Sequence, residues 1–342
     1  MMRVWWACGL LLVSMLACDV RREGGEPVRT AGPVRAAAKG AGDGRFALHP
    51  YLGYTYAPGA DGINRHGFDA GGREYPYVRG ADEFVVGIFG GSTALQVARN
   101  AHEIEQALLP LAARRGYTRV TVLPFAVDGW RQPQPFHAFL AYLPTIDMAV
   151  LIDGLAEVLE FGDASVPGWP ADFPSARIYG ALSGLERGPD VRSRSERVDA
   201  YFEAWEERIR MMDLIGLESG KPVLHFVEPN PYARPEHESD PRADVAAPGY
   251  ERLRDMAERL ARDGVASSLL DGAFDGADEA LYDGECCALN EEGAARLGWA
   301  VAQEGELGGQ FDEAVPAADR KLPPPPAERS GGLPIPVLGS TQ

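Results

Sequence analysis

The sequence predicts an α/β fold in which helices cover both faces of a central parallel sheet of five strands. Five short apolar runs do not alternate with polar residues, which is typical of strands that are buried on both faces. Amphipathic segments with helical period stand between these runs, and this alternation is the pattern of a parallel sheet. The chain has 342 residues, 45% of them hydrophobic, which is enough for one large core or at most two domains.

The expected elements follow one another along a folded body that spans residues 46–305. The strands are predicted, in chain order, at 84–89, 119–125, 148–152, 222–227 and 265–270. The helices are predicted at 102–115, 135–143, 196–217, 250–262 and 290–304. Residues 163–195 break the helical period with several prolines and glycines. We expect them to form a surface insertion, of the kind that often becomes a lid or a rim.

The N-terminal 45 residues predict export and a lipid anchor. Residues 1–17 have a short basic start and then an apolar run that is too short to span a bilayer, as in a signal peptide. Cys18 follows directly, and this junction resembles the bacterial lipobox, in which the cysteine is acylated. An ordinary signal peptide cut nearby stays open as the alternative. Residues 18–45 are rich in Gly, Arg, Ala and Pro and predict a flexible, lipidated tether. The expected location is the bacterial cell envelope, with membrane attachment through the lipid only.

The strongly negative net charge argues against two classes of partner, nucleic acids and anionic lipid surfaces. The chain has 33 basic and 50 acidic residues, a net charge of −17, and removal of residues 1–17 would take the charge to −18. Such an excess repels nucleic acid and anionic lipid surfaces, so neither is expected as a partner. Residues 306–342 are polar and then Pro-rich, and they predict a disordered or extended tail.

A glycine-rich turn at the end of the first predicted strand is the first candidate for chemistry. Its sequence is Gly90-Gly91-Ser92-Thr93. Ligands of open parallel sheets bind beyond the carboxyl ends of the strands, and glycines let a ligand approach the backbone. A serine at this turn can expose its hydroxyl beside the N–H groups of a helix start. The simpler interpretation is that Ser92 is only a helix N-cap.

Further motifs occur in a recognisable order around this turn. They are His49-Pro50-Tyr51-Leu52-Gly53-Tyr54, Asp128-Gly129-Trp130, Asp153-Gly154-Leu155-Ala156-Glu157 and the stretch 283–293. Together with the glycine-rich turn they resemble the SGNH/GDSL hydrolase superfamily, in particular exported bacterial members, over residues 49–304. The resemblance implies a three-layer α/β/α, flavodoxin-like fold. It also implies a serine ester hydrolase that uses no cofactor and no metal.

The resemblance assigns roles to five positions and shows two losses. Ser92 matches the nucleophile, and Gly129 matches the glycine whose N–H helps to hold the oxyanion. Ala156 stands where relatives carry the oxyanion-binding asparagine, and Ala288 stands where they carry the catalytic histidine. Glu285 replaces the aspartate that orients this histidine. A missing oxyanion donor lowers the rate by about 10² to 10³, and a serine hydroxyl without a base is a poor nucleophile at neutral pH.

Three hypotheses about function follow from these departures. The first is a catalytically degenerate envelope lipoprotein whose pocket binds an acylated or glycan ligand without turnover. The second is an active serine esterase or acyl transferase in which another histidine has become the base; the candidates are His49, His66, His102, His137, His225 and His237. The third is an envelope scaffold that acts through its tether and tail.

The remaining distinctive residues receive structural interpretations. Cys286 and Cys287 are adjacent, so they either form a vicinal disulfide or stay as buried thiols, and we expect a structural role. Asp153, Glu157 and Glu160 are expected to be solvated loop carboxylates rather than metal ligands. Among the tryptophans, Trp130 is the best candidate for lining a sugar groove, whereas Trp169 and Trp205 are expected to pack or to lie on a rim.

Overall fold

The computed structural model describes residues 45–49, 51–75, 77–159, 194–233, 242–277, 281–283 and 288–307. The predicted signal peptide, nearly all of the predicted tether and insertion, and residues 308–342 of the predicted tail lie outside the described residues, whereas 306 and 307 belong to the last helix. So do Glu285, Cys286 and Cys287. Within the described part of the chain, no helix has both the length and the apolar character needed to cross a membrane.

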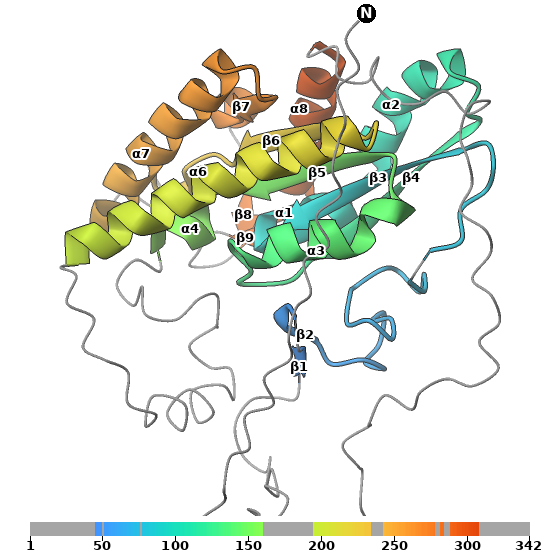
Figure 1. Ribbon diagram of the computed structural model, residues 1–342, viewed down its shortest axis with the longest axis horizontal. Helices are drawn as coiled ribbons and strands as arrows, with labels where there is room; N and C mark the ends of the chain where they lie inside the picture. The colour runs from blue at the N-terminus through green and yellow to red at the C-terminus, as the bar shows by residue number, and fades with distance from the viewer. Residues whose placement is uncertain are drawn as a thin grey trace, which may run out of the picture. The chain divides into compact units, whose positions relative to one another are not determined.

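A five-stranded, wholly parallel sheet forms the centre of the fold (Figure 1). Its strands, in chain order, are β3 (Glu83–Gly90), β4 (Arg119–Ala126), β5 (Met148–Asp153), β6 (Val223–Val227) and β7 (Ser267–Leu269). They lie side by side in the order β4-β3-β5-β6-β7. Every residue of β3, β5 and β6 is buried, which explains why their sequences do not alternate. The predicted parallel sheet of five strands is confirmed, although β7 is shorter than expected.

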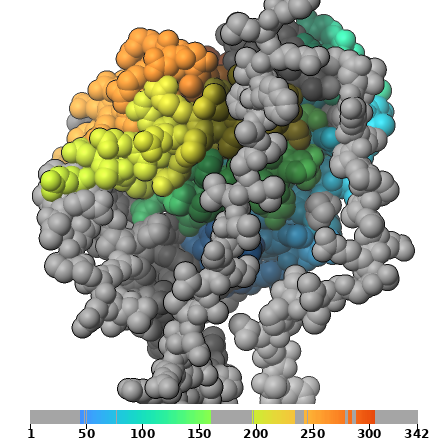
Figure 2. Space-filling model, viewed as in Figure 1, coloured from blue at the N-terminus to red at the C-terminus, as the bar shows by residue number. Residues whose placement is uncertain are grey.

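Two groups of helices flank this sheet. One consists of α1 (Ser92–Arg99), α2 (His102–Arg114) and α8 (Glu291–Leu307), which pack against one another. The other consists of α3 (Gln134–Tyr142), α6 (Arg194–Glu218) and α7 (Ala243–Arg262), in which α6 contacts both of the others. Figure 2 shows α6 and α7 side by side across one face. The apolar stripes predicted from helical period therefore face a shared core.

Two helices differ from expectation. α7 begins at Ala243, seven residues before the predicted start, and runs through Pro248. Proline lacks an N–H, so near a helix start it removes one backbone hydrogen bond without ending the helix. α1 agrees with the helix start expected after the glycine-rich turn, but no bounds were predicted for it, because its eight residues carry only two helical turns of pattern.

The shortest strands and the shortest α-helix were not predicted from the sequence. β1 (Phe46–His49) and β2 (Gly53–Tyr56) form an antiparallel hairpin ahead of the main sheet. β8 (Tyr282–Asp283) and β9 (Ala288–Leu289) form a second antiparallel pair, and α4 (Leu155–Leu159) is one short helix after β5. Segments of two to five residues are too short to show either period. They matter here because α4 and β9 line the candidate site and β2 contacts a loop that borders it.

Candidate functional site

The candidate site lies beyond the carboxyl edge of the sheet, where four parallel strands end. Ser92 follows β3, Gly129 follows β4, Ala156 follows β5 and Glu228 follows β6. They border a pocket of about 340 Å³, which we call the Ser92 pocket. Its lining residues are Gly91, Ser92, Thr93, Gly129, Trp130, Ile152, Gly154, Leu155, Ala156, Glu157, Leu159, Glu228 and Ala288. Ser92, Gly129, Ala156 and Ala288, singled out from the sequence, thus meet in one cavity, while Glu285 lies outside the described residues.

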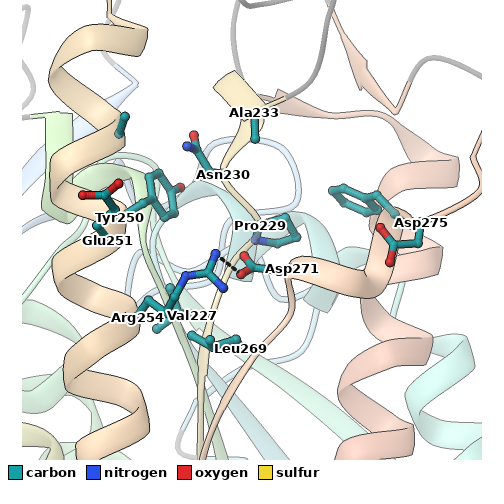
Figure 3. A pocket seen from close by; sticks show the side chains of 12 residues that line it. Val227, Pro229, Asn230, Ala233, Tyr250, Glu251, Arg254, Leu269, Asp271 and Asp275 are labelled. Carbon is teal, nitrogen blue, oxygen red and sulfur yellow. Dashed lines mark ion pairs between the residues drawn. The ribbon is translucent and has the colours of Figure 1, made fainter.

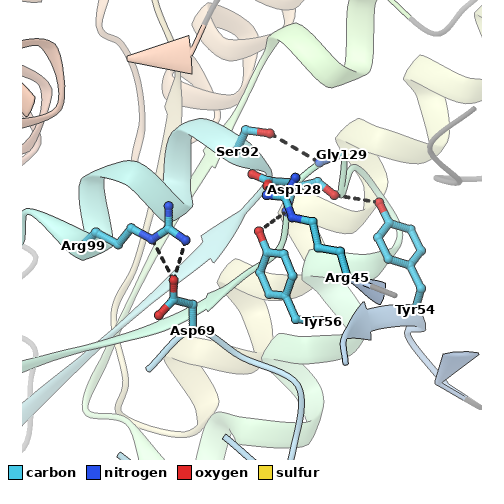
Figure 4. A network of polar contacts seen from close by, with 8 residues as sticks. All are labelled: Arg45, Tyr54, Tyr56, Asp69, Ser92, Arg99, Asp128 and Gly129. Carbon is cyan, nitrogen blue, oxygen red and sulfur yellow. Dashed lines mark hydrogen bonds and ion pairs between the residues drawn. The ribbon is translucent and has the colours of Figure 1, made fainter. Parts of the chain in front are cut away.

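Ser92 directs its hydroxyl toward the loop that carries Gly129. It is the first residue of α1, and the N-cap position belongs to Gly91, with no side-chain capping bond. The N-cap interpretation of Ser92 is therefore wrong. The Gly129 N–H instead donates a hydrogen bond to Ser92 Oγ, with 3.4 Å between nitrogen and oxygen (Figure 4). A Cβ on Gly91 would lie 2.6 Å from the Trp130 carbonyl oxygen, so the two loops approach too closely for any side chain there.

Strand β2 holds the Gly129 loop in place through its tyrosines (Figure 4). The Tyr54 hydroxyl donates to the Asp128 carbonyl at 2.9 Å, and the Asp128 N–H donates to the Tyr56 hydroxyl at 3.2 Å. The Trp130 indole N–H donates to the Tyr54 carbonyl at 3.0 Å, and Arg45 forms an ion pair with Asp128. Sequence reasoning missed this clamp. Its only signal was a pair of tyrosines at alternate positions, and nothing in the sequence said which loop they would reach.

No described histidine forms a hydrogen bond with Ser92. The ring nitrogens contact other groups: His49 contacts the N–H of Tyr51 and of Leu52, His66 contacts Tyr142, His102 contacts Gln106, His137 contacts the Tyr51 carbonyl, and His225 contacts Ser267. His49 thus has the structural role expected from its motif. His137 is exposed. His237 lies outside the described residues.

Three buried acidic side chains lie beneath and beside the pocket. Asp153, Glu157 and Glu228 are all at least nine-tenths buried, so the expectation that Asp153 and Glu157 are solvated is wrong. Glu160 lies outside the described residues. Glu157 accepts the Gly154 N–H at 2.9 Å, and Glu228 accepts the Leu155 N–H. The expectation fails because Asp153 ends β5 inside the core and because α4 directs Glu157 inward.

Burial keeps these acidic groups protonated to unusually high pH. It raises the pKa of Asp153 from 3.8 to about 7, against hydrogen bonds from Gln132 and Trp205 that favour the ionised form. Burial also raises the pKa of Glu157 well above its ordinary value, and the neighbouring Asp153 adds to this rise. The pKa of Glu228 is raised by burial as well, opposed by hydrogen bonds from Thr93 and the Leu155 N–H. Two of these groups, Glu157 and Glu228, line the Ser92 pocket and form its acidic floor, and burial disfavours the ionised form of both.

His225 is a core residue with one satisfied nitrogen. Its Nδ1 lies 2.8 Å from Ser267 Oγ, whereas its Nε2 has no hydrogen-bond partner and lies 3.8 Å from Asp153 Oδ2. Burial lowers the pKa of His225 to about 3, so the ring is neutral. His225 therefore lies in the core and makes no hydrogen bond with Ser92, for which it was a candidate base.

The two described tryptophans that were singled out from the sequence, Trp130 and Trp205, do not form an open sugar groove. Trp130 borders the pocket but is fully buried, and Tyr54 already accepts its indole N–H. Trp205 is also fully buried and donates to Asp153 Oδ2 at 3.0 Å, as a packing role predicts. Trp169 lies outside the described residues.

In the described part of the chain, no group of three or more His, Cys, Asp or Glu side chains is arranged to hold a metal ion. The Ser92 pocket is lined by backbone N–H groups, the hydroxyl-bearing residues Ser92 and Thr93, and the buried carboxyl groups of Glu157 and Glu228. No protein-family model and no curated protein matches this sequence.

Proposed function

We propose that this chain is an SGNH/GDSL-hydrolase-like domain that binds an acylated or glycan ligand in the Ser92 pocket without hydrolysing it. The observation that carries the proposal is that Ala156 and Ala288 border the same cavity as Ser92 and Gly129. Those two alanines occupy the places where the family would put an amide and an imidazole. The pocket keeps the serine and the glycine N–H, but it lacks one oxyanion donor and the base that would activate the serine.

The architecture supports this assignment. If the five strands of the main sheet are numbered along the chain, their spatial order is 2-1-3-4-5, which is the order of flavodoxin-like sheets. The Ser92 and Gly129 loops end neighbouring strands of that sheet, β3 and β4. A small, carbonyl-bearing group fits this arrangement, because the Gly129 N–H and the start of α1 present donors. The acidic floor disfavours an anionic ligand at the same place.

A fluorophosphonate probe tests the proposal directly. Such probes react with activated serines, so we expect Ser92 to label no faster than it does in denatured protein. The Ser92→Ala variant gives the background, and an active serine hydrolase in the same assay gives the positive control. Rapid labelling of the wild type that is lost in Ser92→Ala would overturn the non-catalytic assignment.

An active esterase is the second candidate, and one side chain favours it. Glu228 borders the same pocket as Ser92, and burial raises its pKa toward the range of a useful general base. Its described hydrogen bonds run to Thr93 and the Leu155 N–H rather than to Ser92. If this candidate is correct, both Ser92→Ala and Glu228→Gln abolish hydrolysis of short acyl esters. Absence of any hydrolysis above the Ser92→Ala background removes it.

We also propose that Cys18 anchors the chain to a membrane of the bacterial envelope. The proposal rests on the apolar run of residues 4–17 and the cysteine that follows it. In a bacterial host, the wild type is expected in the membrane fraction and Cys18→Ser in the soluble fraction. Equal fractionation of the two proteins would contradict the lipid anchor.

A further inference from the structure

A second cavity, separate from the Ser92 pocket, lies beyond the carboxyl ends of β6 and β7. We call it the β6–β7 cavity; its volume is about 470 Å³, within the range of small-molecule sites. Residues of β6, β7, α7 and η5 (Asp271–Phe274), with the segments that follow β6 and η5, form its walls. Figure 3 shows Glu251 on the α7 side and Asp275 on the opposite side. This edge of a parallel sheet is where ligands of such folds bind.

A buried phenol in this cavity has no partner. Tyr250 is 6% exposed, and its hydroxyl forms no hydrogen bond with any described residue. Figure 3 shows its ring reaching from α7 toward Pro229 and Asn230, with the hydroxyl at the far end. Burial raises the pKa of Tyr250 well above its usual value, so the group is a neutral O–H. A buried hydroxyl without a partner is destabilising, so a ligand that offers it a polar group would be stabilised here.

The net negative charge of the residues that line the cavity favours a cationic ligand. Of the described residues that line it, Arg254 is the one with a positive side chain, and it forms an ion pair with Asp271 (Figure 3). Glu251 and Asp275 also line the cavity, and neither has an ion-pair partner among the described residues. The walls therefore carry an excess of two negative charges. Both of these carboxylates are exposed, and the excess negative charge would repel an anion and attract a cation.

The other wall residues favour an organic cation over a metal ion. Val227, Leu269 and Phe274 supply apolar surface, and the rings of Phe274 and Tyr250 can face a positive charge. The two unpaired carboxylates stand on opposite walls rather than converging, and the described residues contain no cluster suited to a metal. We propose that the β6–β7 cavity binds a small organic ammonium compound. The ammonium group lies between Glu251 and Asp275, and a polar end of the ligand meets the Tyr250 hydroxyl.

The position of this cavity relates it to the Ser92 pocket. Val227 and Pro229 line the β6–β7 cavity, and Glu228, which stands between them in sequence, lines the Ser92 pocket. The two cavities therefore share the end of β6 as a wall. The inference does not depend on whether Ser92 is catalytic, since Tyr250, Glu251 and Asp275 do not line the Ser92 pocket.

Choline and its uncharged isostere 3,3-dimethylbutan-1-ol form a matched pair of probes for this site. Titration of the full chain, followed by calorimetry or NMR, is expected to show choline binding at least about ten-fold tighter than the isostere. Added salt is expected to weaken choline binding and to leave the isostere unaffected. Equal affinity for the two probes, or no choline binding up to about 10 mM, overturns the proposal.

Variants locate the binding to this cavity. The double variant Glu251→Gln/Asp275→Asn is expected to lose at least about ten-fold in choline affinity, and Tyr250→Phe about three-fold. Glu258→Gln is the control, because Glu258 lies on α7, pairs with Arg262 and is absent from the cavity wall. Circular dichroism confirms that each variant is folded. Unchanged choline affinity in the double variant contradicts the assignment, as does an equal loss in Glu258→Gln.

Discussion

At the scale of single residues, two alanines define the chemistry of the Ser92 pocket. Ala156 and Ala288 border the cavity into which Ser92 and Gly129 project, and methyl groups can neither accept a proton nor stabilise an oxyanion. The five described histidines are held by other partners. The interpretation of this site therefore depends on the absence of an amide at Ala156 and of an imidazole at Ala288.

Restoring the imidazole and the amide by substitution tests whether the pocket has kept a catalytic arrangement. The double variant Ala288→His/Ala156→Asn is expected to raise hydrolysis of a short acyl ester by at least about 10²-fold, because it returns a base and an oxyanion donor. Steady-state kinetics on an acetyl or butyryl ester measure it. The same double variant in a Ser92→Ala background is the control. No gain would show that the backbone of the pocket has departed from a catalytic arrangement.

Tyr54 is expected to matter through the loop that it holds. Tyr54→Phe removes the hydrogen bond to the Asp128 carbonyl and should lower the free energy of unfolding by about 1 kcal/mol. It should also speed hydrogen exchange of the Gly129 and Trp130 amides, which NMR follows residue by residue.

Tyr75→Phe is the matched control for this prediction. Tyr75 is also buried and also donates to a backbone carbonyl, that of Pro124, at 2.9 Å. The Tyr75→Phe variant should lose a similar free energy of unfolding without changing hydrogen exchange of the Gly129 amide. If the two variants change exchange at Gly129 equally, the clamp has no specific role.

At the scale of elements, α8 contains two glycines in opposite environments. A Cβ on Gly293 would lie 2.3 Å from the Leu281 carbonyl oxygen, whereas a Cβ on Gly298 would meet nothing closer than 3.7 Å. Gly293 thus permits close contact between the helix and the segment before β8. Gly298 offers no such reason and only lowers helix propensity.

Substituting each of these glycines by alanine should move stability in opposite directions. Gly298→Ala is expected to raise the free energy of unfolding by up to about 1 kcal/mol through helix propensity. Gly293→Ala is expected to lower it by about 1 to 3 kcal/mol through overpacking. Chemical denaturation of both variants measures the difference. Two changes of the same sign would contradict the packing described for α8.

At the scale of the whole molecule, the buried acidic groups make folding sensitive to pH. Asp153 is the last residue of β5. Gln132 and Trp205 donate hydrogen bonds to it, and its titratable neighbours are His225, Glu157 and Glu228. In the unfolded chain this carboxyl ionises near pH 4, but in the folded chain its proton is held to about pH 7. Between those values the folded state binds more protons, so stability falls as pH rises.

Asp153→Asn isolates this contribution, because the amide oxygen can still accept both hydrogen bonds. The variant and the wild type should differ little near pH 4. The variant should then become the more stable by at least about 1 kcal/mol as the pH rises to about 7. Urea denaturation across this range measures the difference, and taking the difference cancels the opposite effect of His225. A difference that does not change with pH would show that Asp153 is not protonated in the folded protein.

The sequence by itself determined the parallel sheet, its five strands and most of the large helices. It also identified Ser92, Gly129, Ala156 and Ala288, because glycine-rich turns and motif order are local features of the chain. These predictions depend on backbone preference and on residue period, which act within ten to twenty residues.

Only the tertiary structure decided which distant groups meet. It turned Asp153 and Glu157 into the core, aimed Tyr54 and Tyr56 at the Gly129 loop, and formed the β6–β7 cavity around the Tyr250 hydroxyl. Burial and proximity depend on how whole elements pack, and the same acidic or tyrosine side chain has the same local pattern whether it lies in water or in the core. For that reason the proposal about the Ser92 pocket starts from sequence motifs, whereas the proposal about the β6–β7 cavity starts from the fold.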